Sequence, residues 1–481
     1  MSAEDPGMNT AAAKYKQENS VTVSEMAERR EERAAQQHAL LNLLGGEGCV
    51  VCLNLNIAGP VKRSGLADHA FFAAVRDVRD ALFGENCAKL VKSVFVNRKT
   101  GIEALFAVRG DAEKIKIRCM GIEEASPAGR LLDIDVIAPD GTKIGRNASR
   151  KCLICGENAS VCARSRAHSV EELRETTERI LGEALAERTA ELAYEALIAE
   201  VHATPKPGLV DEMNSGANPD MDIPMFEKSA SVLRPFFEKI ALAVLKAGRE
   251  NLDSPALASE LRSIGLEAES AMLAATGGVN THRGAVYTLG LLTAARTAQV
   301  AFSDFSEWDS PAERIFPEPA ENCARLAGKL AETLGDGSLP SSKGAAVRKE
   351  YGVGGAVEQA VAGFPLAVAA KNGRMAYDDL HGEALSLPYA LLAVMAELDD
   401  NNALRRGGKA GAEFVKKRAA ELKKLGESAE PEEFGMALEE FDTELTRMNI
   451  SCGGAADMLA AGIFLESIGN ETAAPGNVFD L

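Results

Sequence analysis

The chain has 481 residues, and at about 150 residues per domain this length predicts two or three domains. Hydrophobic residues make up 46% of it and charged residues 26%, the usual balance of a globular protein with a real core. The formal net charge of −18 argues against partners such as nucleic acid or an anionic membrane, which carry the same sign. No basic segment followed by an apolar run is found near the N-terminus, and no apolar stretch is long enough to span a bilayer, so we expect a cytoplasmic protein.

The first part of the chain mixes strand and helix signals. Residues 1–24 lack a periodic apolar face and are expected to form a disordered tail, followed by a charged helix from Glu25 to Leu44. Strands interleaved with helices then predict an α/β or α+β domain. The expected strands are Val50–Ile57, Leu90–Val96, Ala104–Val108, Ile115–Cys119 and Leu131–Ala138, with a helix at Ala67–Phe83.

The second part of the chain has helical periodicity throughout. From Glu171 to Val201, leucines recur at three- and four-residue spacings, which indicates one long amphipathic helix. We therefore expect a first domain over residues 25–175 and an all-α second domain over residues 176–481. Further helices are expected at Ser229–Ala247, Pro255–Ala274, Gly284–Val300, Cys323–Leu334, Leu387–Asp399, Lys409–Leu425, Phe434–Arg447 and Ala455–Ile468.

Two aspartates stand two residues apart in the last expected strand. Because side chains alternate across a strand, Asp133 and Asp135 share one face, and Leu132, Ile134 and Val136 share the other. Two carboxylates about 7 Å apart on a strand can hold one or two Mg²⁺ ions that bridge a diphosphate or triphosphate. The alternative is an exposed strand face that ends in a turn.

The segment after this strand concentrates positive charge and potential metal ligands. Its basic residues suit a polyphosphate leaving group, and the alternative is a solvated loop. A Cys-x-x-Cys pair followed by a third cysteine and a histidine indicates a structural zinc site, with reduced thiols packed in a turn as the alternative. The basic residues are Lys143, Arg146, Arg150, Lys151, Arg164 and Arg166, and the candidate zinc ligands are Cys152, Cys155, Cys162 and His168.

Five polar loops interrupt the helical part, and most pair glycine with Asp, Asn, Lys or Arg. Two prolines stiffen the loop around Lys206, and Asn280 or Thr281 can cap the helix expected from Gly284. Helix N-termini that converge would gather phosphate and Mg²⁺ sites in one pocket, whereas the alternative is a set of ordinary turns. The loops cover residues 203–222, 277–284, 352–365, 399–408 and 449–457.

Three segments of the first domain resemble the apo-citrate lyase phosphoribosyl-dephospho-CoA transferase family: Leu55–Lys62, Gly129–Asp135 and Cys152–His168. The resemblance implies a nucleotidyltransferase-like domain that transfers a phosphoribosyl-dephospho-CoA group to a serine of the citrate lyase acyl-carrier (gamma) subunit and releases diphosphate. Asp133 and Asp135 are the implied catalytic Mg²⁺ ligands. The residues implied to bind the transferred group are Lys62, Arg130, Arg164 and Arg166.

Four ordered motifs of the helical part resemble the triphosphoribosyl-dephospho-CoA synthase family: Thr204–Asp211, Gly278–His282, Gly363–Pro365 and Asn449–Asp457. The resemblance implies that the 2′-hydroxyl of 3′-dephospho-CoA attacks C1 of the ATP ribose and expels adenine. Such a glycosyl transfer benefits from a carboxylate near C1 and from a general base. The implied catalytic residues are Asp211, Glu358 and Asp457, and the implied substrate-binding residues are Lys206, Asn280, His282, Arg283, Asp400, Arg405 and Asn449.

The helical part departs from this family's pattern at five positions. Arg283 stands where lysine is common, and Asn218 where histidine is frequent. Val357 lies where a basic residue is expected, while Cys452 and Ala455 replace proline and serine. Reduced activity of this part is therefore an open alternative.

Together, these patterns predict a bifunctional enzyme that uses ATP, 3′-dephospho-CoA and Mg²⁺ to build the citrate lyase prosthetic group and then attaches it to the carrier subunit. One alternative is the same chemistry in the service of malonate decarboxylase. Another is a non-catalytic chaperone of the carrier subunit that binds dephospho-CoA or zinc. A nucleotidyltransferase acting on nucleic acid is a third, and the charge of −18 argues against it.

Overall fold

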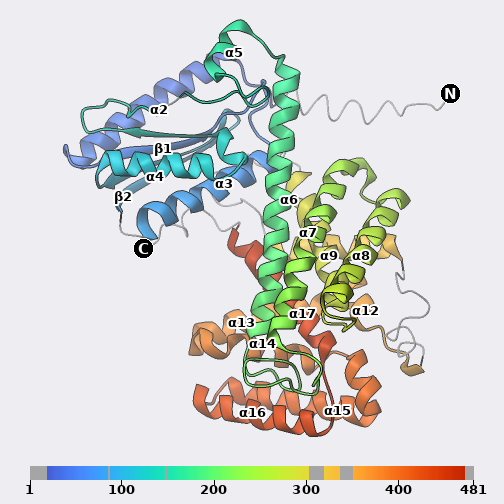
Figure 1. The fold of residues 1–481 in the computed structure, drawn as a ribbon. Coiled ribbons are helices and arrows are strands. Elements are labelled where there is room, and N and C mark those ends of the chain that lie inside the picture. Colours follow the sequence, from blue (N-terminus) through green and yellow to red (C-terminus); the bar gives the residue numbers. More distant parts are fainter. Residues whose placement is uncertain (1–18, 85–86, 147–148, 303–318, 336–349, 472–481) are drawn as a thin grey trace, which may run out of the picture. The chain divides into compact units, whose positions relative to one another are not determined.

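The protein is described here by a computed structural model, which covers residues 19–84, 87–146, 149–302, 319–335 and 350–471. It divides into two compact units, one containing most of the chain up to Leu185 and the other most of the chain from Ala186 (Figure 1). Helix α6 (Val170–His202) runs from the first unit into the second. Among the described helices, none has the length and apolar character needed to cross a membrane.

The first unit is built on a four-stranded antiparallel sheet with the strand order β2-β3-β1-β4. Strand β4 is an edge strand and pairs only with β1 within this sheet. Because neighbouring strands run antiparallel, the unit is α+β rather than α/β. The strands are β1 (Cys49–Leu55), β2 (Lys89–Arg98), β3 (Gly101–Arg109) and β4 (Leu132–Ile137).

Helices cover both faces of the sheet (Figure 1). Helix α2 (Val23–Leu44) buries its last leucines against one face, where Val50, Cys52 and Leu105 meet them. Helices α3 (Gly65–Arg79) and α4 (Ala112–Ala125) pack on the other face, around Phe71. The remaining elements of this unit are α5 (Ala159–Ser165) and the short turns Asp80–Gly84 and Ala128–Leu131.

The expected alternation along β4 is present. Leu132, Ile134 and Val136 are buried in the core under α3 and α4, whereas Asp133 and Asp135 face the α2 side. The register of the sheet supports this placement, because Asp135 lies opposite Cys52, which packs against α2. An apolar face on one side of an edge strand thus leaves a carboxylate pair on the other.

The strand expected at Ile115–Cys119 is wrong, because these residues lie in the middle of α4. The side chain of Asp111 caps this helix by accepting the N–H groups of Glu113 and Lys114 at 3.0 Å each. Ile115 and Cys119 stand one helical turn apart and face the sheet together, so the β-branched residues fit a helix that packs on a core.

Helix α2 begins at Val23, two residues before the expected start at Glu25. Thr22 is its N-cap, and Thr22 and Glu25 form a capping box. Ser20, just before it, forms a β-bridge with Val61. The expected tail therefore overlaps this helix start, and residues 1–18 lie outside the described residues.

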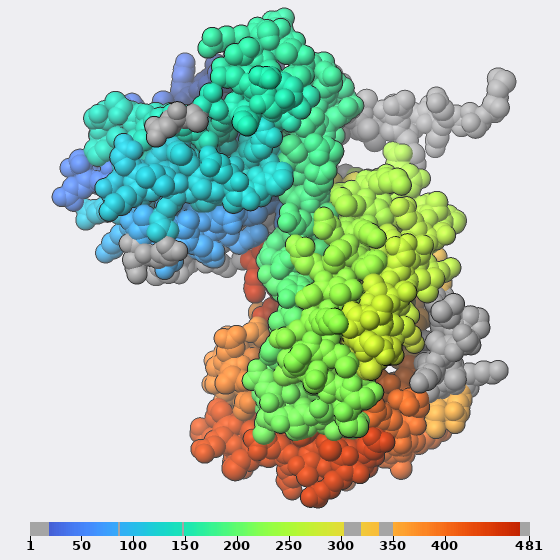
Figure 2. Space-filling model, in the orientation of Figure 1, coloured from blue at the N-terminus to red at the C-terminus, as the bar shows by residue number. Residues whose placement is uncertain are grey.

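The second unit contains only helices among its described residues, so the all-α expectation is confirmed. Helix α9 is buried along almost its whole length, from Ala285 to Val300, and lies at the centre of the core. In the space-filling view, side chains close the gaps between the ribbons of α15 and α16 (Figure 2). The helices are α7 (Ile223–Ala247), α8 (Pro255–Ala275), α9 (Arg283–Ala301), α10 (Pro319–Leu334), α12 (Gly355–Val361), α13 (Pro365–His381), α14 (Ser386–Met395), α15 (Asn401–Gly426), α16 (Pro431–Arg447) and α17 (Gly453–Glu471), with short turns at Arg249–Asn251 and Glu383–Leu385.

Two of the expected loops are largely helical, which corrects the prediction. Residues 352–365 contain α12, and α13 starts at Pro365. Proline is tolerated there because the N–H groups of the first helical turn have no acceptor within the helix. Residues 399–408 contain the start of α15, with Asp400 as its N-cap. The glycines that suggested a loop instead mark a kink, because Gly408 has a left-handed φ of 61° inside α15.

Candidate active sites

The aspartate pair of the first unit lies on a partly exposed face of β4. The side chains of Asp133 and Asp135 are 37% and 18% exposed. Lys143 Nζ lies 2.5 Å from Asp135 Oδ1, and Arg150 Nη2 lies 3.5 Å from Asp133 Oδ1. Two members of the predicted basic segment thus reach the predicted carboxylates.

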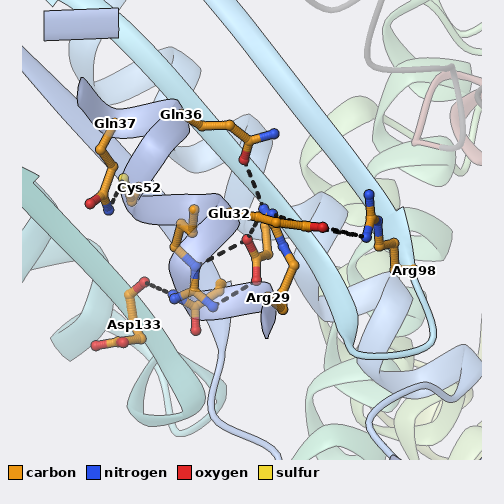
Figure 3. A network of polar contacts seen from close by, with 10 residues as sticks. Arg29, Glu32, Gln36, Gln37, Cys52, Arg98 and Asp133 are labelled. Carbon is orange, nitrogen blue, oxygen red and sulfur yellow. Dashed lines mark hydrogen bonds and ion pairs between the residues drawn. The ribbon is translucent and has the colours of Figure 1, made fainter. Parts of the chain in front are cut away.

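A third carboxylate, which no sequence pattern predicted, lies on the same face of the sheet. Glu103 of β3 is opposite Asn54 of β1, which is opposite Asp133. Glu103 is buried and accepts bonds from Arg29 at 2.5 Å and from Arg33 at 2.7 and 3.1 Å. Figure 3 shows this network around Arg29, together with Glu32, Gln36 and Arg98. On the neighbouring strands, the Asn54 side chain donates separately to the backbone carbonyl of Asp133 at 3.4 Å. Because two arginines compensate Glu103, its carboxylate is less available for a metal than the pair on β4.

Arg150 is fixed from several sides. Its guanidinium donates to the carbonyl of Leu132 at 2.7 Å and pairs with the buried carboxylate of Glu123. Glu123 also pairs with Arg146 and accepts the N–H of Ile134 at 3.0 Å. Arg150 is therefore anchored along the edge of the strand that carries the aspartates.

The three cysteines and the histidine of the candidate zinc site come together. One sulfur or nitrogen atom from each of Cys152, Cys155, Cys162 and His168 lies within 4.8 Å of all the others. Cys155 Sγ is 3.5 Å from Cys162 Sγ and 3.3 Å from His168 Nε2. Backbone N–H groups of Cys155 and Ile154 that donate to the Cys152 sulfur, together with the neighbouring thiols, lower the pKa of the Cys152 thiol to about 7.

The other predicted binding residues of this unit differ in their surroundings. Arg130 donates to the carbonyls of Lys151 and Cys152 at 3.1 and 2.8 Å. Lys62 Nζ donates to the carbonyl of Ile57 at 2.6 Å, and burial lowers its pKa. Arg130 and Lys62 are thus engaged with the backbone, whereas Arg164 and Arg166 are exposed at the end of α5.

In the second unit, Lys206 and His282 are buried. Lys206 is 3% exposed, and its Nζ lies 2.8 Å from both Glu200 Oε1 and the Glu200 carbonyl. His282 Nδ1 is 2.8 Å from Ser229 Oγ, while its buried Nε2 has no hydrogen-bond partner among the described residues. Burial, and then the charge of Lys206, lower the pKa of His282 to about 3, so its imidazole is neutral at pH 7.

Three helix N-termini meet at two carboxylates, the buried Asp400 and the half-buried Asp457. Asp400 accepts the N–H groups of Asn402 and Ala403 in α15, at 2.7 and 3.1 Å, and that of Ala455 in α17 at 2.9 Å. Asp457 of α17 accepts from the backbone of Ala285 in the first turn of α9. Burial raises the pKa of Asp400, and it raises that of Asp457 well above the usual value, with help from the nearby charges of Glu200 and Asp400.

The contact between Asp457 and α9 depends on a glycine. A Cβ atom at Gly284 would overlap the carboxylate of Asp457, so a larger residue here would have to displace the Asp457 side chain. The last glycine of the Gly-Val-Asn-Thr-His-Arg-Gly motif therefore allows the Asp457 side chain to lie against the start of α9. His282, and not the expected Asn280 or Thr281, is the N-cap of α9, although Asn280 Oδ1 accepts the N–H of Arg283 at 3.2 Å.

The loop after α6 is shaped by Asp211. Its carboxylate accepts three backbone N–H groups, from Lys206 and Met213 at 2.8 Å and from Asn214 at 3.0 Å. Asp442, which was not predicted, holds the same loop through the Gly208 N–H at 2.8 Å. These bonds give Asp211 a clear role in positioning Lys206.

Arg406, and not the predicted Arg405, reaches the other loops. Arg406 donates to the Ala217 carbonyl at 2.5 Å, to Asn218 Oδ1 at 2.7 Å and to Asn449 Oδ1 at 3.3 Å. Arg405, next to it in α15, is exposed. The structure therefore joins the loops of Asn218 and Asn449, two of the predicted motifs, through an arginine that lies one position further on.

The last two predicted residues of this unit lie nearer the surface. Glu358 is exposed in α12. Arg283 Nε lies 3.0 Å from Glu269 Oε2, and the Arg283 side chain is 41% exposed. Glu269 also lines a largely apolar cavity between α8 and α9, together with Leu266, Tyr287 and Gly290.

Each unit thus combines acidic side chains with nearby cations, on a sheet face in the first unit and near helix N-termini in the second. Residues 21–184 match the family described as apo-citrate lyase phosphoribosyl-dephospho-CoA transferase, and residues 186–475 match ATP:dephospho-CoA triphosphoribosyl transferase. The chain belongs to the ATP:dephospho-CoA triphosphoribosyl transferase family, and an apo-citrate lyase phosphoribosyl-dephospho-CoA transferase domain precedes that part in tandem.

Curated relatives agree with this assignment. Protein CitXG of Haemophilus influenzae is 34% identical and aligns with 93% of this chain and 96% of its own length. The 2-(5''-triphosphoribosyl)-3'-dephosphocoenzyme-A synthase of Haemophilus ducreyi is 36% identical over 66% of this chain and 99% of its own. A probable synthase of the same name from Pseudomonas putida is 40% identical over 60% of this chain and 96% of its own.

The chain is therefore a transferase of citrate lyase prosthetic-group synthesis and attachment, which confirms the resemblances seen in the sequence. Because the first domain matches a family described for citrate lyase, service to malonate decarboxylase is not favoured.

Proposed function

We propose that the helical unit joins ATP to 3′-dephospho-CoA and that the sheet unit passes the product to a serine of the citrate lyase acyl-carrier (gamma) subunit. In the first step the 2′-oxygen of dephospho-CoA bonds to C1 of the ATP ribose, the bond from C1 to adenine breaks, and the hydroxyl proton leaves. In the second step the serine oxygen bonds to the innermost phosphorus of the triphosphate, and diphosphate leaves. The observation that carries this division is the presence of one separate carboxylate site in each unit.

For the first step, Asp457 is our candidate for the base that takes the hydroxyl proton. Its burial favours the protonated form, so its carboxylate is a stronger base than an exposed aspartate. Asp400 is the second acid at the same helix starts and is suited to stabilise positive charge at C1 in an oxocarbenium-like transition state.

Basic and neutral groups of the same unit fit the rest of ATP. The N-terminus of α9 suits the triphosphate, which must stay intact, and Lys206 would have to exchange its bond with Glu200 for a phosphate oxygen to join it. The unpartnered Nε2 of the neutral His282 is suited to a hydrogen bond with a ribose hydroxyl or with adenine as it leaves. The roles of Asn280, Arg283 and Asn449 in substrate binding stay predictions.

For the second step, the donor set on β4 fits Mg²⁺. Asp133 and Asp135 offer hard oxygen ligands on one partly exposed face, which leaves room for water and phosphate oxygens in the coordination shell. When bound there, Mg²⁺ would neutralise charge on the phosphates. Lys143 and Arg150 already lie against the two carboxylates and are suited to hold the departing diphosphate.

The same features support a nucleotidyltransferase-like arrangement of the sheet unit. An antiparallel sheet presents a carboxylate pair on one strand and a third carboxylate, Glu103, on a nearby strand of the same face. Glu103 is suited to a structural part, because Arg29 and Arg33 satisfy its oxygens.

One experiment tests both steps and separates an enzyme from a carrier-binding chaperone. The full-length protein is incubated with ATP, Mg²⁺ and 3′-dephospho-CoA, and free adenine is measured by chromatography. The apo-carrier subunit is then added, and its mass is measured. We expect stoichiometric release of adenine followed by a mass increase equal to one phosphoribosyl-dephospho-CoA group. Carrier binding with neither product would show a chaperone and would refute the proposal.

A further inference from the structure

The Cys/His cluster is not used by either proposed reaction, although its four side chains converge. Cys152, Cys155, Cys162 and His168 lie within 17 consecutive residues, and their ligand atoms are all within 4.8 Å of one another. The backbone is arranged for this convergence: Gly156 has a left-handed φ of 76°, and the Gly156 N–H donates to the Cys152 carbonyl at 3.2 Å. A turn of this kind brings the first two cysteines to one side.

The chemistry of the donor set favours zinc. Three sulfurs and one imidazole nitrogen are the ligands of closed, four-coordinate structural zinc sites. A disulfide between Cys155 and Cys162 is the main alternative, but it would leave Cys152 and His168 without a reason to converge on the same point.

The cluster is tied to the strand that carries the aspartates. Arg130, just before β4, donates to the carbonyls of Lys151 and Cys152. The Arg150 carbonyl accepts the N–H of Ala159 at 2.9 Å, and Lys151 forms a β-bridge with Asn158. The Arg150 side chain then reaches Leu132 and Asp133 on β4. A metal that closed this loop would therefore fix the arginine next to the carboxylate pair.

We propose that Cys152, Cys155, Cys162 and His168 bind one structural zinc ion, and that this ion positions Arg150 beside Asp133. Three thiolates around Zn²⁺ leave one net negative charge, which the basic segment offsets. The basic side chains closest in sequence to the ligands are Arg150, Lys151, Arg164 and Arg166. Zinc acts here on the shape of the loop and contacts no substrate.

The first test measures metal and does not depend on any activity. Full-length protein, purified under reducing conditions without an affinity tag, is analysed for zinc by mass spectrometry. We expect about one zinc ion per chain. Cys155→Ser and His168→Ala should lose it, whereas Cys87→Ser, which changes a cysteine outside the cluster, should keep it. Absence of zinc from the reduced protein after equilibration with excess zinc would overturn the proposal, as would undiminished zinc in both ligand variants.

A conservative variant guards against a simple folding defect. His168→Cys replaces one zinc ligand by another, so this chain should bind zinc like the wild type. Cobalt substituted for zinc should give the visible bands of a tetrahedral thiolate site in the wild type and in His168→Cys, but not in His168→Ala. Equal spectra in all three proteins would show that His168 is no ligand.

The positioning role, which rests on the proposed function, is tested by the two half-reactions. Removal of zinc by a chelator should slow attachment to the carrier about 10-fold to 100-fold, the usual effect of losing a group that orients others. Adenine release by the helical unit should not change, and added zinc should restore attachment. Failure of adenine release in the untreated protein would instead count against the proposed function. Full attachment activity in the zinc-free protein would overturn the positioning role while leaving the metal site intact.

Discussion

The two units build acidic sites in opposite ways. In the sheet unit, a strand at the edge of the sheet presents two aspartates on a partly open face, where Lys143 and Arg150 meet them from outside. In the helical unit, Asp400 and Asp457 are held inside the bundle by backbone N–H groups at three helix starts. An open face suits an acceptor that is itself a protein, whereas an enclosed site keeps water away from a reactive ribose. The difference indicates that the nature of the acceptor shapes each site.

The largest expected effect comes from removing one acid from each site in turn. Asp133→Asn should lower attachment by about 10³-fold or more while leaving adenine release unchanged, because only the sheet site loses a phosphate-facing carboxylate. Asp457→Asn should do the reverse when premade triphosphoribosyl donor is supplied for the attachment assay. The matched controls are Asp80→Asn and Asp379→Asn, two exposed aspartates of the respective units. If either site variant lost both activities, the division of labour between the units would be wrong.

A smaller effect is expected from Gly284→Ala. The added Cβ would overlap the Asp457 carboxylate and push it away from α9, so adenine release should fall about 10²-fold. Attachment from premade donor should stay at the wild-type rate. Gly469→Ala is the control, because a Cβ in that part of α17 meets nothing within 4 Å. Adenine release equal to that of the control would mean that the contact is not needed.

The pH dependence of stability provides a third test of the enclosed site. Burial raises the pKa of Asp457 well above its usual value of 3.8, so above that pH the folded chain holds a proton that the unfolded chain releases. Stability should therefore fall as the pH rises, by about 1.4 kcal/mol per pH unit while the proton is held. Asp457→Asn should remove this slope, and Asp379→Asn should keep it. Urea unfolding at several pH values measures the slopes, and parallel curves for the wild type and Asp457→Asn would contradict the assignment.

The smallest expected effect separates two neighbouring arginines. Arg406→Ala removes bonds to Ala217, Asn218 and Asn449, which should lower the free energy of unfolding by about 1–3 kcal/mol. Arg405→Ala changes an exposed side chain and should stay within about 0.5 kcal/mol of the wild type. Thermal or urea unfolding of the two variants compares them directly. A larger loss of stability in Arg405→Ala than in Arg406→Ala would contradict this assignment of the structural contacts, whereas the predicted role of Arg405 in substrate binding is not tested by unfolding.

Patterns local in the sequence predicted the structure well. The alternation around Ile134 correctly placed Asp133 and Asp135 on one face, and the spacing of the cysteines anticipated their meeting with His168. The stretch from Ile115 to Cys119 misled, because apolar β-branched residues fit a buried strand and a core-facing helix equally, and the cap at Asp111 decided for the helix. Glycines near Gly408 likewise suggested a loop where the backbone only kinks.

Contacts between residues distant in the sequence could not be predicted from local patterns. Glu103 meets Arg29 and Arg33 only because the sheet register and α2 bring them together, and they are more than 60 positions apart in the chain. Arg406 was missed in favour of Arg405 because the phase of a helix around a polar loop is not evident from composition. Asp211 is a different case, because its three partners, the N–H groups of Lys206, Met213 and Asn214, are close in the sequence, and its catalytic role stays a prediction.

The uninterrupted course of α6 has a practical consequence for anyone who separates the two activities. The two family matches meet between residues 184 and 186, inside a helix that runs from Val170 to His202. Dividing the gene there would create two new helix ends, each with about four backbone N–H or C=O groups that have no partner within the helix. Each product would also keep only part of the amphipathic surface of α6. A cut before Val170 would keep the helix whole with the second product, but it would take Ile180 and Leu181 from the packing around Leu131. The shared helix α6 therefore completes the packing of both domains, and neither domain keeps all of its contacts when the chain is cut.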